Sequence, residues 1–356
     1  VLEDGSTYCW GNNDYGQLGD GSVSESSTAM DVEGIDGSSA SASEIDAGAK
    51  LTCSVLSSGS AACWGRNNYG QLGDGSTDNS SEYVTVSGID GITATATEVT
   101  TGGYHACALL DDGAVKCWGR NGYGQLGDTS TDDSEIPVDV SGIDGSTSVA
   151  TQIAAGSYST CALLSNGAVK CWGFNSKGQL GNGSTTDASS PSAVSGIDGS
   201  TYTATAISVG HLDHACALLD DGSIMCWGEN KYGQLGNAST TDSSVPVDVS
   251  GIDGSTDTAI AVDTGYQSSC AILDDGSLKC WGRNNYSQLG DGTTTTATSP
   301  TDVSGIDGST ATATKLAVGD YHSCAILDDG SVNCWGRNDY GQLGDGTTTT
   351  ATSPTE

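Results

Sequence analysis

The chain has 356 residues, of which 52 are glycine, 5 are proline and 1 is phenylalanine. This composition, dominated by Gly, Ser, Thr and Val, is typical of short strands and tight turns, and it argues against a helical or doubly wound core. The formal charge of -34 makes nucleic acid and anionic membranes poor partners, because a strongly acidic surface repels phosphate groups.

The chain begins with the sequence of a hairpin turn. Residues 1–5 align with residues 326–330 of a later repeat, so we expect the chain to start inside a hairpin. The expected cysteine partner of Cys9 would precede Val1, which leaves Cys9 unpaired. There is no signal-peptide pattern, and no apolar run reaches the roughly 20 residues that span a bilayer. We therefore expect a mature or trimmed chain without direct membrane insertion.

The tripeptide Cys-Trp-Gly recurs along the whole chain at a nearly constant spacing. Its copies are 54 or 55 residues apart and begin at Cys9, Cys63, Cys117, Cys171, Cys226, Cys280 and Cys334. Each is followed by Gly-Gln-Leu-Gly or, once, by Ser-Gln-Leu-Gly, and copies of Gly-Ile-Asp-Gly lie between them. Self-similarity at such a period indicates stacked structural repeats. We predict seven units in a single domain over residues 1–356, with one unit incomplete within this chain.

Each unit carries four segments with the character of strands. The alternation at residues 310–314 predicts a first strand. Residues 107–110 and 114–118 flank a three-residue turn that ends in Gly113, which predicts a hairpin. The segment at residues 137–140 supplies a fourth strand. Four strands per unit are typical of one propeller blade, so the predicted fold is an all-β, seven-bladed β-propeller with repeats of about 54 residues.

Twelve of the 13 cysteines form pairs that are ten residues apart. In the predicted hairpin Cys107 faces Cys117 on the adjacent strand. We predict six disulfides within blades: Cys53–Cys63, Cys107–Cys117, Cys161–Cys171, Cys216–Cys226, Cys270–Cys280 and Cys324–Cys334. Disulfides require an oxidising compartment, so we expect an extracellular or cell-surface location. Sequons that would allow glycosylation there lie at Asn79, Asn182, Asn237 and Asn285.

The repeat also resembles a known family. Its pattern, Gly-x-x-His-x-Cys-Ala-Leu/Ile-Leu-Asp-Asp-Gly-x-Val-x-Cys-Trp-Gly-x-Asn-x-Tyr-Gly-Gln-Leu-Gly, is most complete at residues 102–127 and 319–344. It resembles the regulator of chromosome condensation repeat over the whole chain, which implies a seven-bladed propeller, here of the secreted prokaryotic type with cysteine-paired blades. The family's founding member is a nucleotide exchange factor that docks on chromatin, a role that an acidic, cysteine-paired chain does not fit. A similar secreted bacterial inhibitor binds its target through loops on one face.

Several repeat positions are candidates for function. The tryptophans in Cys-Trp-Gly are predicted to pack between blades. The same is predicted for Tyr15, Tyr69, Tyr123, Tyr232, Tyr286 and Tyr340, with a role on an exposed face as the alternative for these tyrosines. His105, His214 and His322 share one position and are interpreted as polar turn residues, because no convergent catalytic or metal-binding partners are visible. No catalytic motif is recognisable, so we expect no enzyme and no cofactor.

The acidic surface has two interpretations. It is either a solvated shell suited to salty water or a means of binding cations. The repeated turns around Asp20, Asp74 and Asp345 make calcium the specific alternative, although none has the alternating acidic ligands of an EF-hand.

The fourth and fifth units depart most from the repeat. Phe174 and Glu229 replace the arginine found at Arg66, Arg120, Arg283 and Arg337, while the first unit has Asn12 there. One residue is inserted near His211. If one sector binds a partner, the candidate residues are Phe174, Lys177, His211, Leu212, Asp213, His214, Glu229 and Lys231.

Two functions remain open. The first is a non-enzymatic extracellular binding or adhesion module of a salt-adapted prokaryote, which recognises a protein or glycan through loops on a propeller face. The alternative is a structural subunit of a filament or surface layer, assembled with itself by strand complementation at the incomplete blade.

Overall fold

A computed structural model describes residues 1–356. No helix in it is long and apolar enough to cross a membrane. The chain divides into two compact units. Unit 1 comprises residues 1–165, 170–174 and 187–192, and unit 2 comprises residues 166–169, 175–186 and 193–356. The single domain expected from the sequence stays a prediction.

The strands form seven antiparallel sheets, which we number in chain order. The first sheet contains only β1 (Ser6–Gly11) and β2 (Ser26–Asp36). Each later sheet has four strands in sequence order. The first strands are β3 (Ala42–Ala47), β7 (Ala96–Thr101), β11 (Ala150–Ala155), β15 (Ala204–Val209), β19 (Ala259–Thr264) and β23 (Ala313–Val318). The second strands are β4 (Leu51–Leu56), β8 (His105–Leu110), β12 (Ser159–Leu164), β16 (His214–Leu219), β20 (Ser268–Leu273) and β24 (His322–Leu327).

The third and fourth strands complete each sheet. The third strands are β5 (Ser60–Gly65), β9 (Ala114–Gly119), β13 (Ala168–Gly173), β17 (Ser223–Gly228), β21 (Ser277–Gly282) and β25 (Val332–Gly336). The fourth strands are β6 (Ser80–Asp90), β10 (Ser134–Asp144), β14 (Ala188–Asp198), β18 (Ser243–Asp253), β22 (Ala297–Asp307) and β26 (Ala351–Thr355). The four strands expected per unit are confirmed in these six sheets.

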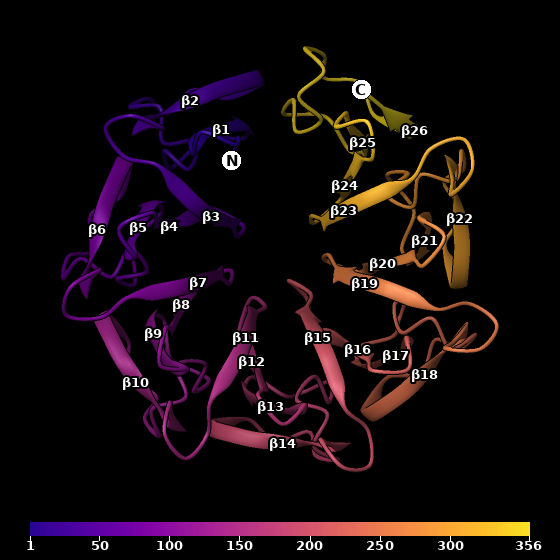
Figure 1. The fold of residues 1–356 in the computed structure, drawn as a ribbon, viewed down its shortest axis with the longest axis horizontal. Coiled ribbons are helices and arrows are strands. Elements are labelled where there is room, and N and C mark those ends of the chain that lie inside the picture. The colour runs from indigo at the N-terminus through magenta and orange to yellow at the C-terminus, as the bar shows by residue number, and fades with distance from the viewer. The chain divides into compact units, whose positions relative to one another are not determined.

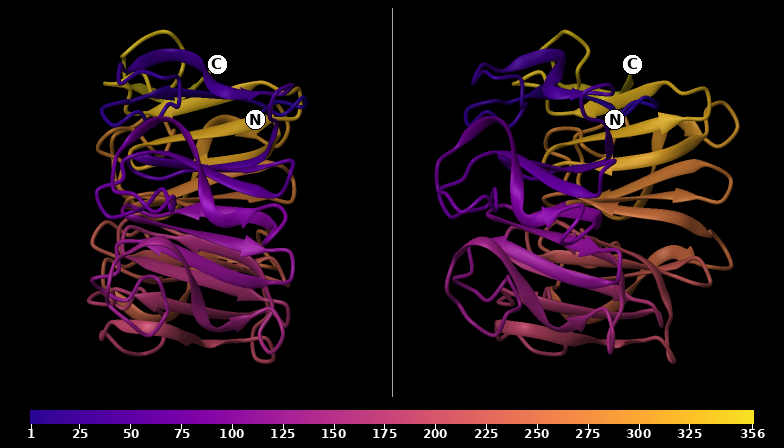
Figure 2. Two further views of the ribbon diagram at one scale, coloured as in Figure 1. Left: turned by 90° about the vertical axis from the view of Figure 1, so that its left-hand side faces the viewer. Right: turned by 60° about the vertical axis from the view of Figure 1, so that its left-hand side comes forward.

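Within each unit the sheets stand side by side. In unit 1 the first strands β3, β7 and β11 adjoin one another, and β2, β6 and β10 adjoin one another at the outer edge (Figure 1). The left view of Figure 2 shows the strands of unit 1 running across the view, one sheet beside the next. Unit 2 repeats this order with β15, β19 and β23 at the inner edge. Residues at one repeat position in neighbouring sheets of a unit are therefore neighbours in space.

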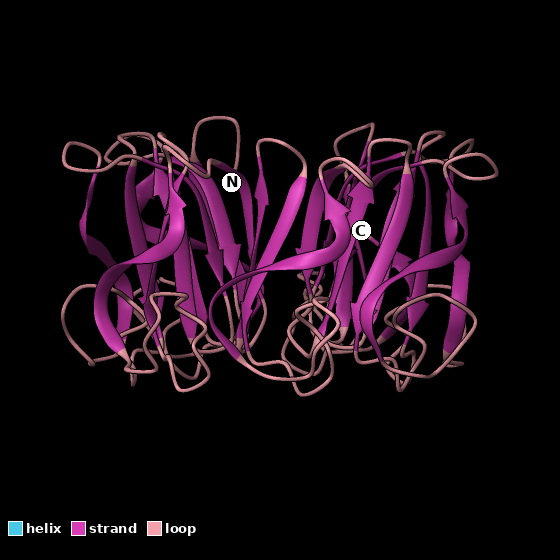
Figure 3. Cartoon of the chain, turned by 90° about the horizontal axis from the view of Figure 1, so that it is seen from below, coloured by secondary structure: helices cyan, strands magenta, loops and turns pink.

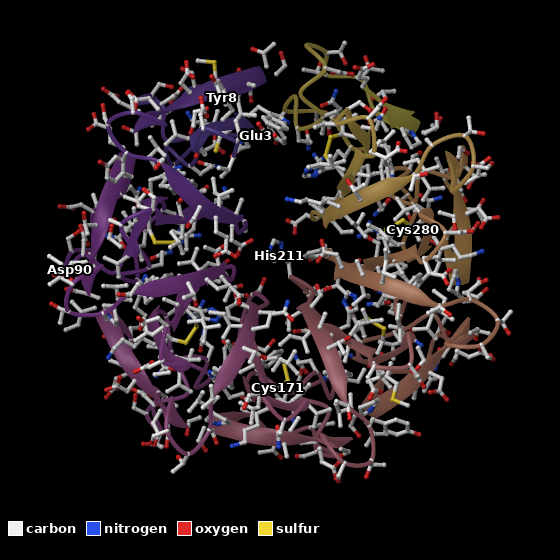
Figure 4. All side chains as sticks on the ribbon, viewed as in Figure 1. Glu3, Tyr8, Asp90, Cys171, His211 and Cys280 are labelled. Carbon is white, nitrogen blue, oxygen red and sulfur yellow. A yellow bond between two sulfur atoms is a disulfide. The ribbon has the colours of Figure 1, made fainter.

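The hairpin between the second and third strands forms as predicted. In the third sheet Cys107 pairs with Cys117, and the turn closes at Gly113, whose φ of +85° lies in the left-handed region that glycine tolerates. The six predicted disulfides are all confirmed, with Cα–Cα distances of 4.0–4.1 Å (Figure 4, sulfur in yellow). Cys9 forms no disulfide, and burial raises the pKa of its thiol to about 12.

The prediction of a first strand over residues 310–314 is wrong in its start. The strand β23 begins at Ala313, because the preceding residues form a turn held by Asp307. The carboxylate of Asp307 accepts hydrogen bonds from the backbone N–H groups of Ser309 (2.9 Å) and Thr310 (2.7 Å). A side chain that caps its own turn takes backbone donors away from the sheet, which the alternating pattern alone cannot reveal.

The core lies between neighbouring sheets and is built on tryptophan. Trp118 is fully buried, and its indole N–H donates to the backbone oxygen of Gln71 in the preceding sheet at 2.9 Å. The same 2.9 Å bond recurs between Trp64 and Gln17, Trp172 and Gln125, Trp227 and Gln179, Trp281 and Gln234, and Trp335 and Gln288. Packing between blades is thus confirmed for these tryptophans. A Cβ on Gly73 would lie 2.8 Å from the Trp118 nitrogen, which explains the glycine that follows Gln-Leu.

Candidate functional site

Three repeat positions lie at one end of each four-stranded sheet, because the connection between its first and second strands and the connection between its third and fourth strands leave the sheet at the same end. Figure 3 shows the loops gathered at the two ends of the strands. In the third sheet the three positions hold Tyr104, Arg120 and Tyr123. The backbone N–H of Arg120 donates to the carbonyl of Tyr104 at 3.0 Å, so these two side chains start from adjacent points. Gly119 permits this approach, since its φ is +104° and a Cβ there would lie 2.8 Å from the Tyr104 oxygen.

In unit 1 these positions build a continuous cluster of arginine and aromatic rings. The guanidinium carbon of Arg120 lies 5.1–5.9 Å from four ring centroids, those of Tyr69, Tyr104, Tyr123 and Tyr158. Arg66 lies 5.1–5.9 Å from Tyr15, Tyr69 and Tyr104. Tyr104 and Tyr158 stack with centroids 5.1 Å apart. Because these side chains are half-buried, they are held in place and still present one side to solvent.

Unit 2 carries a second cluster of the same type. Arg283 lies 5.1–5.8 Å from Tyr232, Tyr286 and Tyr321. Arg337 lies 5.2–5.7 Å from Tyr286, Tyr321 and Tyr340. We call the two sets together the Arg–Tyr clusters; their members are Tyr15, Arg66, Tyr69, Tyr104, Arg120, Tyr123 and Tyr158 in unit 1, and Tyr232, Arg283, Tyr286, Tyr321, Arg337 and Tyr340 in unit 2.

The charge distribution sets these clusters apart from the rest of the molecule. The chain has only four arginines among 45 acidic residues, and all four occupy this one position. Arg337 pairs with Asp339 at 2.7 Å, whereas Arg66, Arg120 and Arg283 have no carboxylate within 4.0 Å. Burial, followed by the neighbouring Tyr104, raises the pKa of Tyr158 to about 12, so this ring stays neutral. A surface in which arginines make cation–π contacts with tyrosines, and not ion pairs with carboxylates, is suited to binding a partner molecule.

Sequence reasoning missed half of this arrangement. Tyr104, Tyr158 and Tyr321 lie in the loops before the second strands and received no role, although they complete the clusters. From the sequence, the arginines were considered only as the residues that Phe174 and Glu229 replace in the fourth and fifth units, and they were assigned no function. The concentration of every arginine at one repeat position in an acidic chain is the signal that could have found the site.

The predicted binding sector is divided by the structure. Phe174 belongs to unit 1 and packs on Tyr123, with centroids 4.8 Å apart. The other seven residues belong to unit 2: Lys177, His211, Leu212, Asp213, His214, Glu229 and Lys231. Asp213 and Glu229 come together there, because the N–H of Glu229 donates to the Asp213 carbonyl at 2.6 Å. Burial, and then the charge of Glu229, raises the pKa of the Asp213 carboxyl to about 6.

The remaining sector residues have separate partners. Lys177 forms an ion pair with Asp242 at 3.3 Å, and the Lys231 ammonium lies 5.3 Å from the Tyr232 centroid. His211, which Figure 4 labels, lies in the loop after β15, and its Nδ1 is 2.6 Å from the carboxylate of Asp320. The Leu212 carbonyl accepts a bond from the ring of His214 at 3.3 Å. Whether this sector binds a partner stays a prediction.

The interpretation of the three histidines as turn residues is wrong. His105, His214 and His322 are the first residues of β8, β16 and β24. His105 is fully buried, and its Nε2 lies 2.8 Å from the hydroxyl of Thr160 in the next sheet. Burial lowers the pKa of His105 to about 3 and that of His214 to about 4, and it also lowers the pKa of His322. His214 makes the equivalent contact, with its Nε2 3.0 Å from the hydroxyl of Ser269, so the rings of His105 and His214 act as neutral links between sheets.

The acidic turns are engaged by their own loops. Asp20 accepts hydrogen bonds from the backbone N–H of Ser22 at 3.0 Å and from the amide of Asn13 at 3.3 Å. Asp74 and Asp345 accept equivalent bonds from Ser76 and Thr347. No group of three or more acidic, histidine or cysteine side chains is arranged to hold a metal ion. The turns thus have a structural use that the sequence did not reveal.

A groove in unit 1 and two buried glutamates at its inner edge are weaker candidates for a functional site. A groove beside the second and third sheets is lined by Ser87, Thr93 and Ile136, and its only charged residue, Lys116, pairs with Asp139. At the inner edge of unit 1, burial raises the pKa of Glu44 to about 7 and that of Glu98 to about 8. Each of these carboxyls accepts a backbone N–H of the neighbouring first strand, from Val99 at 3.1 Å and from Ile153 at 3.2 Å respectively, so both link sheets.

Comparison with known proteins decides the family. The sequence matches the family described as "Regulator of chromosome condensation (RCC1) repeat" at residues 4–55, 58–109, 112–163, 166–218, 221–272, 275–326 and 329–356. The chain belongs to the RCC1 repeat family. The RCC1 repeats account for all seven sheets, and the predicted seven-bladed β-propeller is confirmed.

Individual relatives agree on the fold and differ in what they are. The chain is 29% identical to the E3 ubiquitin-protein ligase HERC2 of Homo sapiens over 98% of its own length but only 7% of that protein. It is 29% identical to the ultraviolet-B receptor UVR8 of Arabidopsis thaliana over 97% of its length and 76% of the receptor's.

Solved RCC1 propellers are similar in fold. Yeast RCC1 (Prp20), solved bound to Kap60, has a TM-score of 0.84 at 20% identity, with 98% of this chain and 82% of that chain covered. Human WBSCR16 has a TM-score of 0.85 at 22% identity, with 98% and 93% covered. At these identities the structures establish the fold alone.

Proposed function

We propose that this RCC1-type propeller is a non-enzymatic extracellular binding module of the secreted prokaryotic type, which recognises a protein or glycan through the Arg–Tyr clusters. The observation that carries the proposal is the concentration of all four arginines among half-buried tyrosines at one end of the sheets. Tyrosine and arginine supply most of the binding energy in many interfaces, because a rigid ring buries a large area and a guanidinium forms several directed hydrogen bonds.

The disulfides support the extracellular location. Six cystines in one chain require an oxidising environment to persist, and all twelve sulfur atoms lie on paired strands within blades. Intact mass before and after reduction and alkylation tests this directly. Denatured protein purified without reductant should take up one alkyl group, at Cys9, before reduction and thirteen after it, and more than one free cysteine before reduction would argue for a reducing compartment.

The binding role is tested by capture experiments with matched variants. Immobilised protein is exposed to biotinylated surface proteins and to a glycan array, both for the wild type and for a Tyr104→Ser, Tyr158→Ser double variant. The control is Ile92→Ser, which removes a side chain that is 92% exposed in the turn after β6, at the other end of the same unit. We expect the double variant to lose capture and the control to retain it. Equal capture by all three proteins would exclude the clusters as the binding surface.

A structural subunit assembled by strand complementation is the second candidate. It is favoured by the first sheet, in which β1 pairs with β2 alone while every other sheet has four strands. Edge strands are templates for the addition of another strand. Light scattering coupled to size exclusion tests it across protein concentration and with calcium or chelator. Large assemblies would support the subunit, and a monomer at all concentrations would support the binding module.

A further inference from the structure

Buried glutamine amides beneath the arginines lack an acceptor. Gln71, Gln125 and Gln288, which follow Arg66, Arg120 and Arg283 by five residues, are 0–1% exposed. Each side-chain oxygen accepts the backbone N–H of the tyrosine two residues before it, at 2.8–3.0 Å, which fixes the orientation of the amide. The amide nitrogen at the other end has no hydrogen-bond partner in any of the three. A buried donor without an acceptor costs about 1–3 kcal/mol, so three at one repeat position call for an explanation.

Sheets without the arginine satisfy the same amide. The Gln17 nitrogen donates to the side-chain oxygen of Asn12 at 2.7 Å. In the fifth sheet the Gln234 nitrogen donates to the carboxylate of Glu229 at 3.2 Å, and Gln267 of the next sheet donates to the same oxygen at 3.3 Å. Asn12 and Glu229 occupy the position of the arginines. The amide therefore points at this position, and the fifth sheet demonstrates that a carboxylate fits there.

The arginines add unused donors at the same place. The Nε atoms of Arg66 and Arg283 are buried without a hydrogen-bond partner, while Nη1 of Arg283 donates to the side-chain oxygen of Gln267 at 2.9 Å. Arg337 differs, because its Nε donates to the carboxylate of Asp339 at 2.7 Å. Hydrogen-bond donors without an acceptor therefore lie together in the sheets whose arginine has no carboxylate partner. In the fifth sheet, where Glu229 replaces the arginine, the glutamine amide already has a carboxylate acceptor. Such a set of donors is complementary to an oxygen anion.

We propose that Arg66, Arg120 and Arg283 each bind a side-chain carboxylate of an acidic partner protein, and that this carboxylate bridges the guanidinium and the glutamine amide. The inference rests on the proposed binding function and names the chemistry of its partner. Glu229 is the built-in counterpart of such a ligand, since its carboxylate already accepts two amides at the same repeat position. On binding, the guanidinium rotates against the tyrosine rings that it contacts, a motion that the long arginine side chain allows.

The variation between sheets favours a protein over an acidic polysaccharide. The position holds Asn12, Phe174 and Glu229 in three sheets, and the neighbouring loop position changes from Tyr158 to Asp213. A repeating polymer would be matched by a regular series of equal sites, whereas an irregular set of arginine and tyrosine anchors is typical of protein interfaces.

The four arginines make a direct test by NMR practicable. With 15N-labelled arginine the intact protein gives four Nε–H signals, which single Arg→Lys variants assign. The probe is the peptide acetyl-(Glu-Gly)3-amide, and its matched control is acetyl-(Gln-Gly)3-amide. We expect the glutamate peptide to shift the signals of Arg66, Arg120 and Arg283 in a saturable way and to leave Arg337 unmoved, because Asp339 already occupies its Nε. In Asp339→Asn, Arg337 should respond as well.

Three outcomes would overturn the proposal. The absence of shifts would show that the donors bind no carboxylate. Equal shifts of all four signals in the wild type, or with the glutamine peptide, would indicate diffuse effects of charge or peptide. Shifts with polygalacturonate but not with the glutamate peptide would assign the clusters to a glycan.

A second measurement separates this inference from the proposed function. The triple variant Arg66→Lys, Arg120→Lys, Arg283→Lys keeps the charge and removes the planar fork that binds a carboxylate. In the capture experiment it should bind the partner about tenfold more weakly than the wild type. Undiminished capture would overturn carboxylate recognition and leave the binding module intact. Failure of the wild type to capture anything would count against the binding module, while the NMR titration would still report on the arginines.

Discussion

The third and fifth sheets have the same strand order and opposite chemistry at one end, and the fifth has one inserted residue in the loop before β16. Tyr104 and Arg120 in the third sheet correspond to Asp213 and Glu229 in the fifth, and the same backbone hydrogen bond joins each pair. In the third sheet the amide of Gln125 lacks an acceptor beneath an arginine, whereas Gln234 in the fifth donates to Glu229. The same strand framework therefore supports either a surface with unpaired hydrogen-bond donors, as in the third sheet, or a surface whose donors are bonded to the chain's own carboxylate, as in the fifth. The difference teaches that the framework and the site are separable.

The largest expected effect tests whether the framework is indeed shared. Trp118→Ala and Trp227→Ala should each lower the free energy of unfolding by about 3–5 kcal/mol, because both indoles are fully buried and both donate to a backbone oxygen at 2.9 Å. Chemical denaturation measures both values, with Tyr340→Ala at a 40% exposed ring as the mild control. If one variant lost less than half as much free energy of unfolding as the other, the two sheets would not share one framework.

The next effect should have opposite signs in the two sheets. Gln125→Glu places an acceptor beside Arg120, so the free energy of unfolding should rise by about 1 kcal/mol. Gln234→Glu places a second carboxylate beside Glu229 and removes a hydrogen-bond donor, so the free energy of unfolding should fall by about 2 kcal/mol. Denaturation of the two variants under identical conditions measures the difference. Changes of the same sign would mean that the two positions are not electrostatically distinct.

The carboxyl of Asp213 in the fifth sheet should titrate between pH 4 and 6. The folded-state pKa of Asp213 is raised to about 6 from 3.8, so its contribution to stability is fully present below pH 3.8 and is lost as the pH rises through 6. Asp213→Asn keeps an acceptor for Gln179 and should be more stable than the wild type at pH 7, by about 1–2 kcal/mol. The advantage should vanish at pH 4. Denaturation at both pH values checks this, and a constant difference would refute it.

The smallest effect concerns the arginine itself. Arg120→Gln removes the cation–π contacts but supplies an oxygen that can accept the orphaned amide of Gln125, so stability should change by less than about 1 kcal/mol. Thermal or chemical denaturation measures the change. A loss above 2 kcal/mol would show that the arginine is a structural residue, and the recognition role would lose its main support.

Much of the fold was predictable because it depends on local patterns. The hairpin around Gly113 followed from its turn residues, and the pairing of Cys107 with Cys117 followed from strand register. The burial of tryptophan followed from its presence in every repeat. The start of β23 was missed because the Asp307 side chain captures nearby backbone N–H groups, a competition that alternation does not encode.

The sequence by itself thus determined the repeat, the strands, the cystines and the unequal distribution of charge, all of which are properties of spacing and composition. Only the tertiary structure decided that Tyr104 and Tyr158 stack beside Arg120, that His105 is buried between sheets, and that the amide of Gln125 has no acceptor. These facts join residues of neighbouring sheets. The physical reason is that a hydrogen bond or a ring contact depends on positions in space to within a few tenths of an ångström, and the packing of one blade against the next sets those positions.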